Sequence, residues 1–272
     1  SSYKQNKKFY WAWLIFSLAT LSFTLGDAIW AFQEAILGID PFYSIGNIFF
    51  LAYYPLFLLG IFSIPSQEFS AEERTKMILD FGIVMIAGTI IFWDFIIGPV
   101  IQESANYDLL DLIIYIFYPL GDLILLFSVL EILFRKIYGN EKRPLLFLAA
   151  GLTALIITDS IFLRQSWLDT YVGGGLLDLG WAISYVLIGL AGMAQTGVMA
   201  KSSLSTHNAR QLRYGELTWI IYLPYICAAG AFALLIWSHE NPIGMSFSAL
   251  SWAVAIIIGM VILRQVIVLN EN

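Results

Sequence analysis

The sequence predicts an all-helical (all-α) membrane protein with about eight transmembrane helices. Hydrophobic residues make up 59% of the 272-residue chain and charged residues only 12%, whereas soluble domains carry roughly 25% charged residues. Eight segments are apolar over the roughly 20 residues that a spanning helix needs. Aromatic residues reach 16%, as expected for belts at two membrane interfaces. A water-soluble monomer is therefore excluded.

The predicted helices follow one another through short loops, so neighbours should pack as antiparallel hairpins. They run approximately over residues 9–37, 44–63, 76–101, 108–134, 144–166, 174–199, 215–238 and 244–269. Residues 1–272 would then form a single transmembrane domain.

Lysine and arginine predict the orientation. Thirteen of the fourteen basic residues fall on one side of this arrangement, and only Arg164 falls on the other. The positive-inside rule places both termini in the cytoplasm of a multi-pass protein of the cell membrane. The opposite loops are mainly acidic, which favours cationic or neutral ligands. The expected partners are the lipid bilayer and a small molecule, cation or lipid, and no nucleic acid.

A weak internal repeat runs through the first six predicted helices. Helices two, four and six share a ten-residue pattern at residues 47–56, 111–120 and 178–187. It begins with Asn or Asp, continues with any six residues, and ends with Tyr, then Pro or Val, then Leu. The helix before each of them carries an aspartate: Asp27, Asp94 and Asp159. The pattern predicts three hairpins, related by an axis along the membrane normal, and a divergent fourth. The hairpins are 9–63, 76–134, 144–199 and 215–269.

Polar residues of the repeat would lie at a similar depth near the non-cytoplasmic side. A charge within the bilayer is costly, so such residues usually face the bundle interior or a water-filled cavity. Helical spacing also places Asp111, Tyr115, Tyr118 and Asp122 on one face. We therefore expect an outward-opening polar pocket for a cation, an amine or a lipid headgroup. The candidate ligand-binding residues are Asp27, Glu34, Asn47, Tyr54, Asp94, Asp111, Tyr115, Tyr118, Asp122, Asp159, Asp178 and Tyr185.

The alternative is that these groups are structural. An aspartate in the first turn caps a helix and complements its dipole, and a tyrosine hydroxyl can donate to an acid of a partner helix. Hydrogen bonds that define a fold recur in each repeat, which favours this interpretation for the repeated acids. Asp122 and Glu34 break the repeat and are the better ligand candidates.

Several chemistries are disfavoured. No lysine lies deep within a predicted span, which argues against a retinal Schiff base. His207 and His239 fall in loops on opposite sides, which argues against an intramembrane bis-histidine haem and a His–Cys zinc site. No Ser-His-Asp pattern or phosphate-binding glycine loop occurs. We predict no catalytic residue, no metal site and no enzymatic activity for this domain, and we assign no cofactor.

The last predicted helix ends in an apolar seam. Ile258, Ile262, Gln265 and Leu269 are spaced as the a and d positions of a coiled coil. The spacing predicts that the helix continues into a cytoplasmic coiled coil and pairs in a homodimer. The alternative is a frayed helix end.

Short motifs recur at residues 26–30 (Gly-Asp-Ala-Ile-Trp), 54–56 (Tyr-Pro-Leu), 118–122 (Tyr-Pro-Leu-Gly-Asp) and 177–181 (Leu-Asp-Leu-Gly-Trp), with Tyr185 and the exit segment 264–272. With these motifs, most of residues 20–272 resembles the N-terminal multi-pass sensor modules of bacterial and archaeal signalling proteins. Those modules precede PAS, diguanylate cyclase or histidine kinase domains.

The resemblance implies a sensory input domain that relays ligand or membrane state through the last helix to an output domain. The full-length protein would then carry a kinase or cyclase domain. The alternatives are a transporter or channel for a cation or small amine, and an intramembrane transferase acting on lipids.

Overall fold

The computed structural model describes residues 2–39, 44–65, 69–102, 109–134, 142–204, 221–241 and 243–270. All regular secondary structure within these residues is helical, with η marking π-helix. The elements are α1 (Ser2–Phe32), η1 (Gln33–Leu37), α2 (Gly46–Ser63), α3 (Ala71–Phe92), η3 (Trp93–Ile97), α4 (Gly98–Gln102), α5 (Leu109–Phe134), α6 (Lys142–Trp167), α7 (Asp178–Leu204), α8 (Leu223–Ser238) and α9 (Phe247–Asn270).

Within the described residues, seven helical spans are long and apolar enough to cross a membrane. The eighth apolar helix, α8, is shorter at 16 residues. The all-helical class is therefore confirmed, and the apolar spans support a membrane protein. Residues 215–220, the predicted start of the seventh helix, lie outside the described residues.

Helix starts differ most from the prediction where the first turn is polar or glycine-rich. Helix α3 begins at Ala71 rather than near residue 76, because Ser70 and Glu73 form a capping box. The Ser70 hydroxyl accepts from the Glu73 backbone N–H at 3.2 Å, and the Glu73 carboxylate accepts from that of Ser70 at 3.0 Å. Helix α7 begins at Asp178 rather than at residue 174, because Gly174 has a φ of +78° and lies in the preceding loop.

Two helices change to π-helix near one end of the bundle. Segment η1 continues α1 and contains Glu34, and η3 continues α3 and contains Asp94. Single π-turns within helices are frequent at functional sites. Hydropathy alone does not reveal them, because an apolar run reads the same in either helix type.

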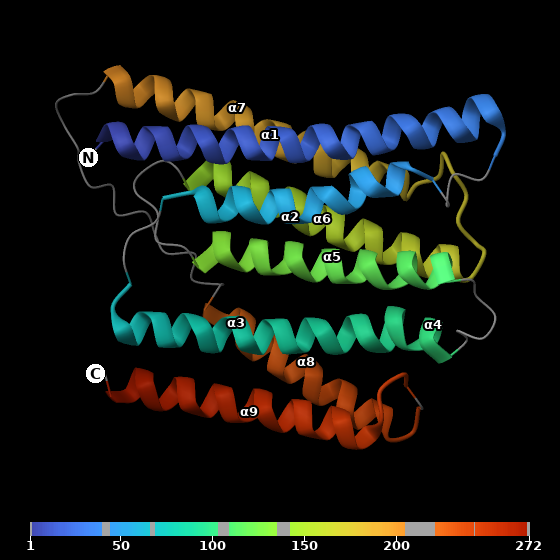
Figure 1. The fold of residues 1–272 in the computed structure, drawn as a ribbon. Helices are drawn as coiled ribbons and strands as arrows, with labels where there is room; N and C mark the ends of the chain where they lie inside the picture. The colour runs from blue at the N-terminus through green and yellow to red at the C-terminus, as the bar shows by residue number, and fades with distance from the viewer. Residues whose placement is uncertain are drawn as a thin grey trace.

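The helices lie along a common direction, and both chain termini lie at the same end (Figure 1). We call this the terminal end and the opposite one the cavity end. Helices α1, α2, α5, α6 and α7 share one apolar core, the five-helix unit. Helices α3, α8 and α9 share a second core, the three-helix unit, which includes the fully buried Ile83, Leu250 and Ile257.

Sequential neighbours do not all form intimate hairpins. Helices α1 and α2 pack closely, as do α6 and α7, whereas α3 packs more on α8 and α9 than on its sequence neighbour α5. The face of α3 that carries Ile83, Ala87 and Ile90 belongs to the three-helix core. The threefold relation between hairpins stays a prediction.

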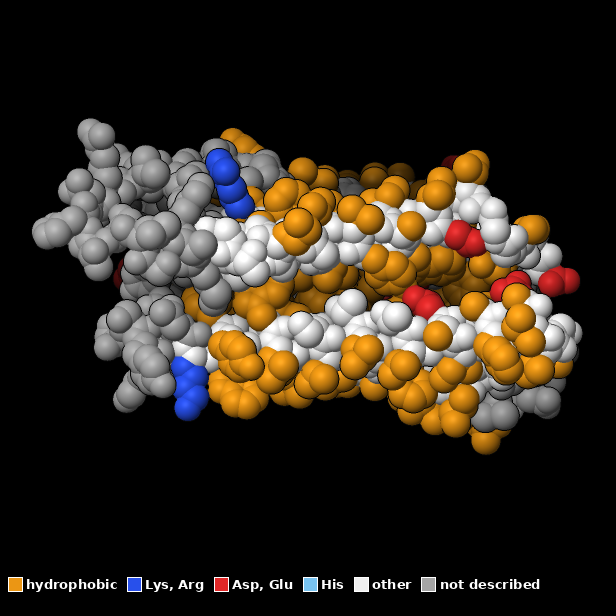
Figure 2. Space-filling view, turned by 90° about the horizontal axis from the view of Figure 1, so that it is seen from above, with side chains coloured by type: hydrophobic (Ala, Val, Ile, Leu, Met, Phe, Trp, Pro, Cys, Tyr) orange, Lys and Arg blue, Asp and Glu red, His pale blue; other side chains and the backbone are white. Residues whose placement is uncertain are grey.

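The outer surface of the bundle is apolar. Figure 2 shows hydrophobic side chains along the length of one face, with acidic side chains toward the cavity end and basic ones toward the terminal end. Large apolar side chains such as Leu21, Leu59, Ile157 and Trp252 are more than half exposed. Such a surface suits lipid rather than water.

Candidate functional site

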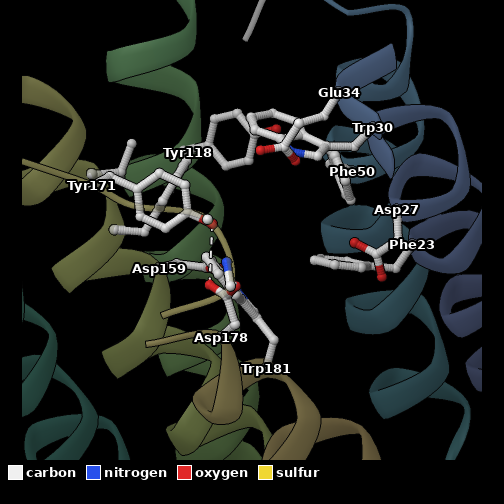
Figure 3. Close-up of a pocket in the computed structure, with 14 residues that line it drawn as sticks. Phe23, Asp27, Trp30, Glu34, Phe50, Tyr118, Asp159, Tyr171, Asp178 and Trp181 are labelled. Atoms are coloured by element: carbon white, nitrogen blue, oxygen red, sulfur yellow. Dashed lines mark hydrogen bonds between the residues drawn. The ribbon is translucent and has the colours of Figure 1, made fainter. Parts of the chain in front are cut away.

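A cavity of about 210 Å³ lies at the cavity end of the five-helix unit (Figure 3). Among the described residues, four carboxyl groups and seven aromatic rings line it, and no basic side chain does. Asp27 and Glu34 come from α1 and η1, and Asp159 and Asp178 come from α6 and α7 on the opposite side. The cavity is therefore acidic and aromatic.

Two of the acids accept hydrogen bonds from aromatic side chains of α7. Asp27 accepts from the Tyr185 hydroxyl at 3.0 Å, which ties α1 to α7. Asp159 accepts from the Trp181 indole N–H at 2.6 Å, which ties α6 to α7. Each of these hydrogen bonds uses one oxygen of the carboxyl group and holds the residue in place.

Asp178 has a structural partner for each oxygen. One oxygen accepts from the Tyr171 hydroxyl at 3.1 Å and the other from the Gly174 backbone N–H at 2.6 Å. Burial, together with the nearby charges of Asp178 and Glu34, raises the pKa of Tyr171 well above its ordinary value. The tyrosine hydroxyl therefore keeps its proton and donates it. Asp178 fixes the loop before α7, as the structural interpretation expects.

Glu34 is the most accessible acid of the cavity. It comes from η1, it is exposed, and no hydrogen bond or ion pair from another described residue reaches its carboxylate. A Cβ atom added to Gly173 would lie only 2.9 Å from its Oε1, so the glycine lets the carboxylate approach the loop. Glu34 is therefore available to a ligand.

Aromatic rings form a continuous wall between the acids. Trp30 lies 6.5 Å from Phe50 and 6.3 Å from Phe162, measured between ring centroids. Phe162 in turn lies 5.4 Å from Trp181 and 4.8 Å from Tyr171. These contacts are edge-to-face, the arrangement that ring quadrupoles favour. The wall joins α1 and α2 to α6, α7 and the loop before α7.

Asp122 lies behind the cavity and does not line it. Its side chain is fully buried, and it interacts with the carboxyl group of Asp159 and the hydroxyl of Tyr54. Within the described chain, neither Asp122 oxygen nor the Tyr54 hydroxyl makes a well-formed hydrogen bond. Gly121 allows this approach, since a Cβ there would lie 2.5 Å from the Tyr54 ring. Burying an acid without a basic partner costs free energy, so the position of Asp122 requires a structural or functional explanation.

Of the twelve predicted candidates, the five that line the cavity are Asp27, Glu34, Tyr118, Asp159 and Asp178. Asn47 accepts from the Tyr118 hydroxyl at 2.8 Å, and Tyr185 holds Asp27. Tyr115 packs in a separate apolar cluster with Phe92 and Leu163. Asp111 belongs to α5, but its side chain is outside the described set.

Asp94 lies apart from the cavity, although the repeat groups it with Asp27 and Asp159. Its Oδ1 accepts from the Met245 backbone N–H at 2.7 Å, just before α9. It therefore tethers η3 to the entry of α9 in the three-helix unit.

Apart from Tyr118, the sequence interpretation missed the aromatic lining, although a signal was present. Each of three acids has an aromatic residue three positions later, on the same helical face: Trp30 after Asp27, Phe162 after Asp159 and Trp181 after Asp178. Asp94 and Asp111 have isoleucine at that position. The spacing of an acid and an aromatic residue three positions later thus occurs in the first and third hairpins and not at these acids of the second.

A second polar cluster, also missed, joins the three-helix unit near the terminal end. Arg264 of α9 forms a buried ion pair with Asp80 of α3. The Arg264 guanidinium donates to the Tyr225 hydroxyl of α8 at 2.6 Å and lies 5.2 Å from the ring centroid. Gln265 also donates to that hydroxyl. The signal was a pair of opposite charges within two predicted spans, near the same end.

No group of three His, Cys, Asp or Glu side chains suited to a metal ion occurs among the described residues. No protein-family model, curated protein or solved structure matches the chain. The fold and the site thus describe a helical membrane protein with an acidic, aromatic cavity at one end.

Proposed function

We propose that this chain is a membrane-embedded sensory input domain, with about eight spanning helices and both termini in the cytoplasm. The cavity is the stimulus site, and α9 carries the response to a cytoplasmic output domain. A ligand shifts such a protein only by its difference in affinity for two arrangements of the helices. The cavity acids and the aromatic wall, which come from α1, α2, α6 and α7, are where that difference arises.

The main support is that the described residues that line the cavity all lie toward the cavity end of the five-helix unit. Beyond Asp122 the five-helix unit contains a layer of tightly packed apolar side chains that are at most 2% exposed: Phe16, Phe57, Leu125, Leu148 and Leu152. A site at one end of the bundle, separated from the terminal end by tightly packed apolar side chains, suits a receptor better than a channel or transporter.

Helix α9 has the features of a transmitting element. Asp94 of η3 accepts a hydrogen bond from the Met245 backbone N–H just before α9, and Asp80 of α3 forms an ion pair with Arg264 near the other end of α9. Ile258, Ile262 and Leu269 of the predicted seam are 41%, 58% and 71% exposed. An apolar seam available on one face supports the homodimer expected from the sequence.

The proposal is tested with the reading frame beyond the codon for Asn272 and with the full-length product. We expect the frame to continue through a coiled coil into a kinase, cyclase or PAS-like domain. The output activity of that protein in liposomes should change in the Asp27→Asn variant. A stop codon directly after Asn272, or an output unaffected by changes at both Asp27 and Arg264, would contradict the proposal.

Orientation has a separate test. In a Cys227→Ser background, single cysteines at Glu240 and Arg74 report opposite ends of the bundle. A membrane-impermeant maleimide added to intact cells should label the cysteine at 240 and spare that at 74. The reverse pattern would place the cavity on the cytoplasmic side.

One observation favours a second candidate, a transporter of a cation or small amine. Asp122 and Tyr54 extend polar groups from the cavity into the middle of the five-helix unit, and neither makes a well-formed hydrogen bond within the part of the chain that the structure describes. Substrate flux into liposomes that is lost in the Asp122→Asn variant would favour transport over sensing.

A further inference from the structure

The charge of the cavity selects against anions. Among the described residues, no lysine, arginine or histidine lies beside its four carboxyl groups in the lining. Arg164, an arginine near this end of the bundle, is engaged elsewhere: it donates to the Phe95 carbonyl at 3.3 Å and lies 4.7 Å over the Trp167 ring. A cleft lined by one sign of charge concentrates ligands of the opposite sign.

The acids are poorly arranged for a bare metal ion. Hard cations such as Ca²⁺ need six to eight oxygen ligands. Here both oxygens of Asp178 already accept hydrogen bonds, and one oxygen each of Asp27 and Asp159 does so too. Among the described residues, no three acids are grouped so that they could hold a metal ion together, whereas a single free carboxylate oxygen can accept from the N–H group of an ammonium ion.

The aromatic wall suits an organic ligand. An ammonium group within about 6 Å of an aromatic face is attracted to the ring quadrupole, and apolar atoms gain from burial against the same rings. Trp30, Phe162 and Trp181 provide these faces beside the acids. A cavity of about 210 Å³ is small beside the roughly 300–1,000 Å³ of sites for drug-sized ligands, so the ligand is small.

A buried carboxyl group behind the cavity supports a cationic ligand independently. Asp122 is fully buried, has no basic partner among the described residues, and interacts with Asp159, which lines the cavity. Two adjacent buried carboxyl groups repel unless a proton or a positive charge is added. A cation bound against Asp159 adds that charge.

We propose that the cavity binds a small organic cation, a protonated amine or quaternary ammonium with a compact apolar body. Asp27, Glu34 and Asp159 receive the positive group, and the apolar body packs against Trp30, Phe162 and Trp181. The assignment of this ligand as a stimulus rests on the sensory function proposed above, whereas its binding does not.

The test is a binding measurement on the purified chain in lipid nanodiscs, by isothermal titration calorimetry with empty nanodiscs as the blank. The probes are phenethylammonium, butylammonium and tetramethylammonium, with 2-phenylethanol as the neutral isostere and Ca²⁺ as the metal control. We expect at least one ammonium probe to bind, and phenethylammonium to bind about tenfold or more tightly than 2-phenylethanol, a difference of about 1.4 kcal/mol.

Matched variants assign the binding to the cavity. Glu34→Gln and Asp27→Asn should each weaken ammonium binding about tenfold, since each removes a charge and keeps the shape of the side chain. Glu240→Gln changes an exposed acid outside the lining and should leave binding unchanged. A thermal unfolding scan of each variant shows that it is folded.

Three results would overturn the ligand class: no binding of any ammonium probe, equal binding of 2-phenylethanol, or binding of Ca²⁺ alone. If neither Glu34→Gln nor Asp27→Asn changes the affinity for the ammonium probe, the binding site lies elsewhere and the proposal is also overturned. The output of the full-length protein separates the two proposals. Binding without any change of output contradicts sensing alone, and an output that responds to other stimuli without ammonium binding contradicts the ligand class alone.

Discussion

Replacing Arg264 by methionine should destabilise the three-helix unit strongly. Arg264 is 8% exposed and its partner Asp80 is 4% exposed, so water screens neither charge. Methionine has a similar apolar stem but leaves the Asp80 carboxylate buried without its cation. Breaking a buried pair from one side typically costs about 3–5 kcal/mol. We expect Arg264→Met to lie in that range, because it also removes the donor to Tyr225.

The reverse substitution separates the ion pair from the other contacts. Asp80→Asn leaves Arg264 bonded to the Tyr225 hydroxyl and stacked on its ring, so the guanidinium keeps part of its environment. Its cost should be the smaller of the two, about 2–3 kcal/mol. In the double variant neither charge remains, and the total should fall below the sum of the single effects by about 2–3 kcal/mol.

The assay is equilibrium unfolding of the purified protein in mixed micelles with increasing SDS, followed by tryptophan fluorescence. Arg74→Met is the matched control, because Arg74 is exposed on α3 near the same end, and it should change the unfolding free energy by less than about 0.5 kcal/mol. If the single effects are additive, or if Arg264→Met costs no more than Arg74→Met, the interaction between Arg264 and Asp80 contributes nothing to the free energy of unfolding.

Three further predictions concern stability: the first two use the same unfolding measurement, and the third uses the melting temperature as a function of pH. Gly121→Ala should destabilise by about 1–3 kcal/mol because its Cβ would lie 2.5 Å from the buried Tyr54 ring, whereas Gly189→Ala meets nothing within 4 Å and should be neutral or slightly stabilising. Ser70→Ala should cost about 1 kcal/mol through loss of the capping box, and no change would refute that role. The folded state holds the Tyr171 proton more tightly than the unfolded chain, where the pKa is 10.0, so this contribution to stability is present below pH 10 and is lost as pH rises above it. Tyr171→Phe should therefore flatten the decline of the melting temperature above pH 10, and an identical decline in both proteins would contradict the assignment.

The sequence predicted the helical spans because length and hydropathy are local properties. It placed the ends less well, since the polar first turn at Ser70 and the glycine loop before Asp178 carry little hydropathy signal. It could not predict the π-helical segments η1 and η3, which depend on how the helix ends pack. It also could not predict that α3 would pack mainly on α8 and α9, because helix pairing depends on tertiary contacts distant in sequence.

The site was predicted only in part, because its acids are visible in the local sequence and their packing is not. Intramembrane acids are conspicuous in an apolar sequence, so Asp27, Glu34 and Asp159 were identified as candidates. The aromatic lining was missed because aromatic residues are abundant in this chain, and only their spacing from the acids distinguishes them. Asp94 shares the repeat with Asp27 but serves a different unit, because equal position in a repeat does not ensure equal surroundings once the hairpins pack differently.

The pairing of α3 with α8 and α9 has a consequence for biogenesis. Ribosomes deliver helices to the membrane from the N-terminus, so α3 is inserted well before its principal partners are synthesised. Until α9 arrives, Asp80 lacks Arg264, the partner of its buried ion pair. The five-helix unit lacks only α7 once α6 is inserted, whereas the three-helix unit is completed last. A premature stop before α9 would therefore leave α3 without its main partner helix, a form that quality-control proteases of the membrane would be expected to degrade.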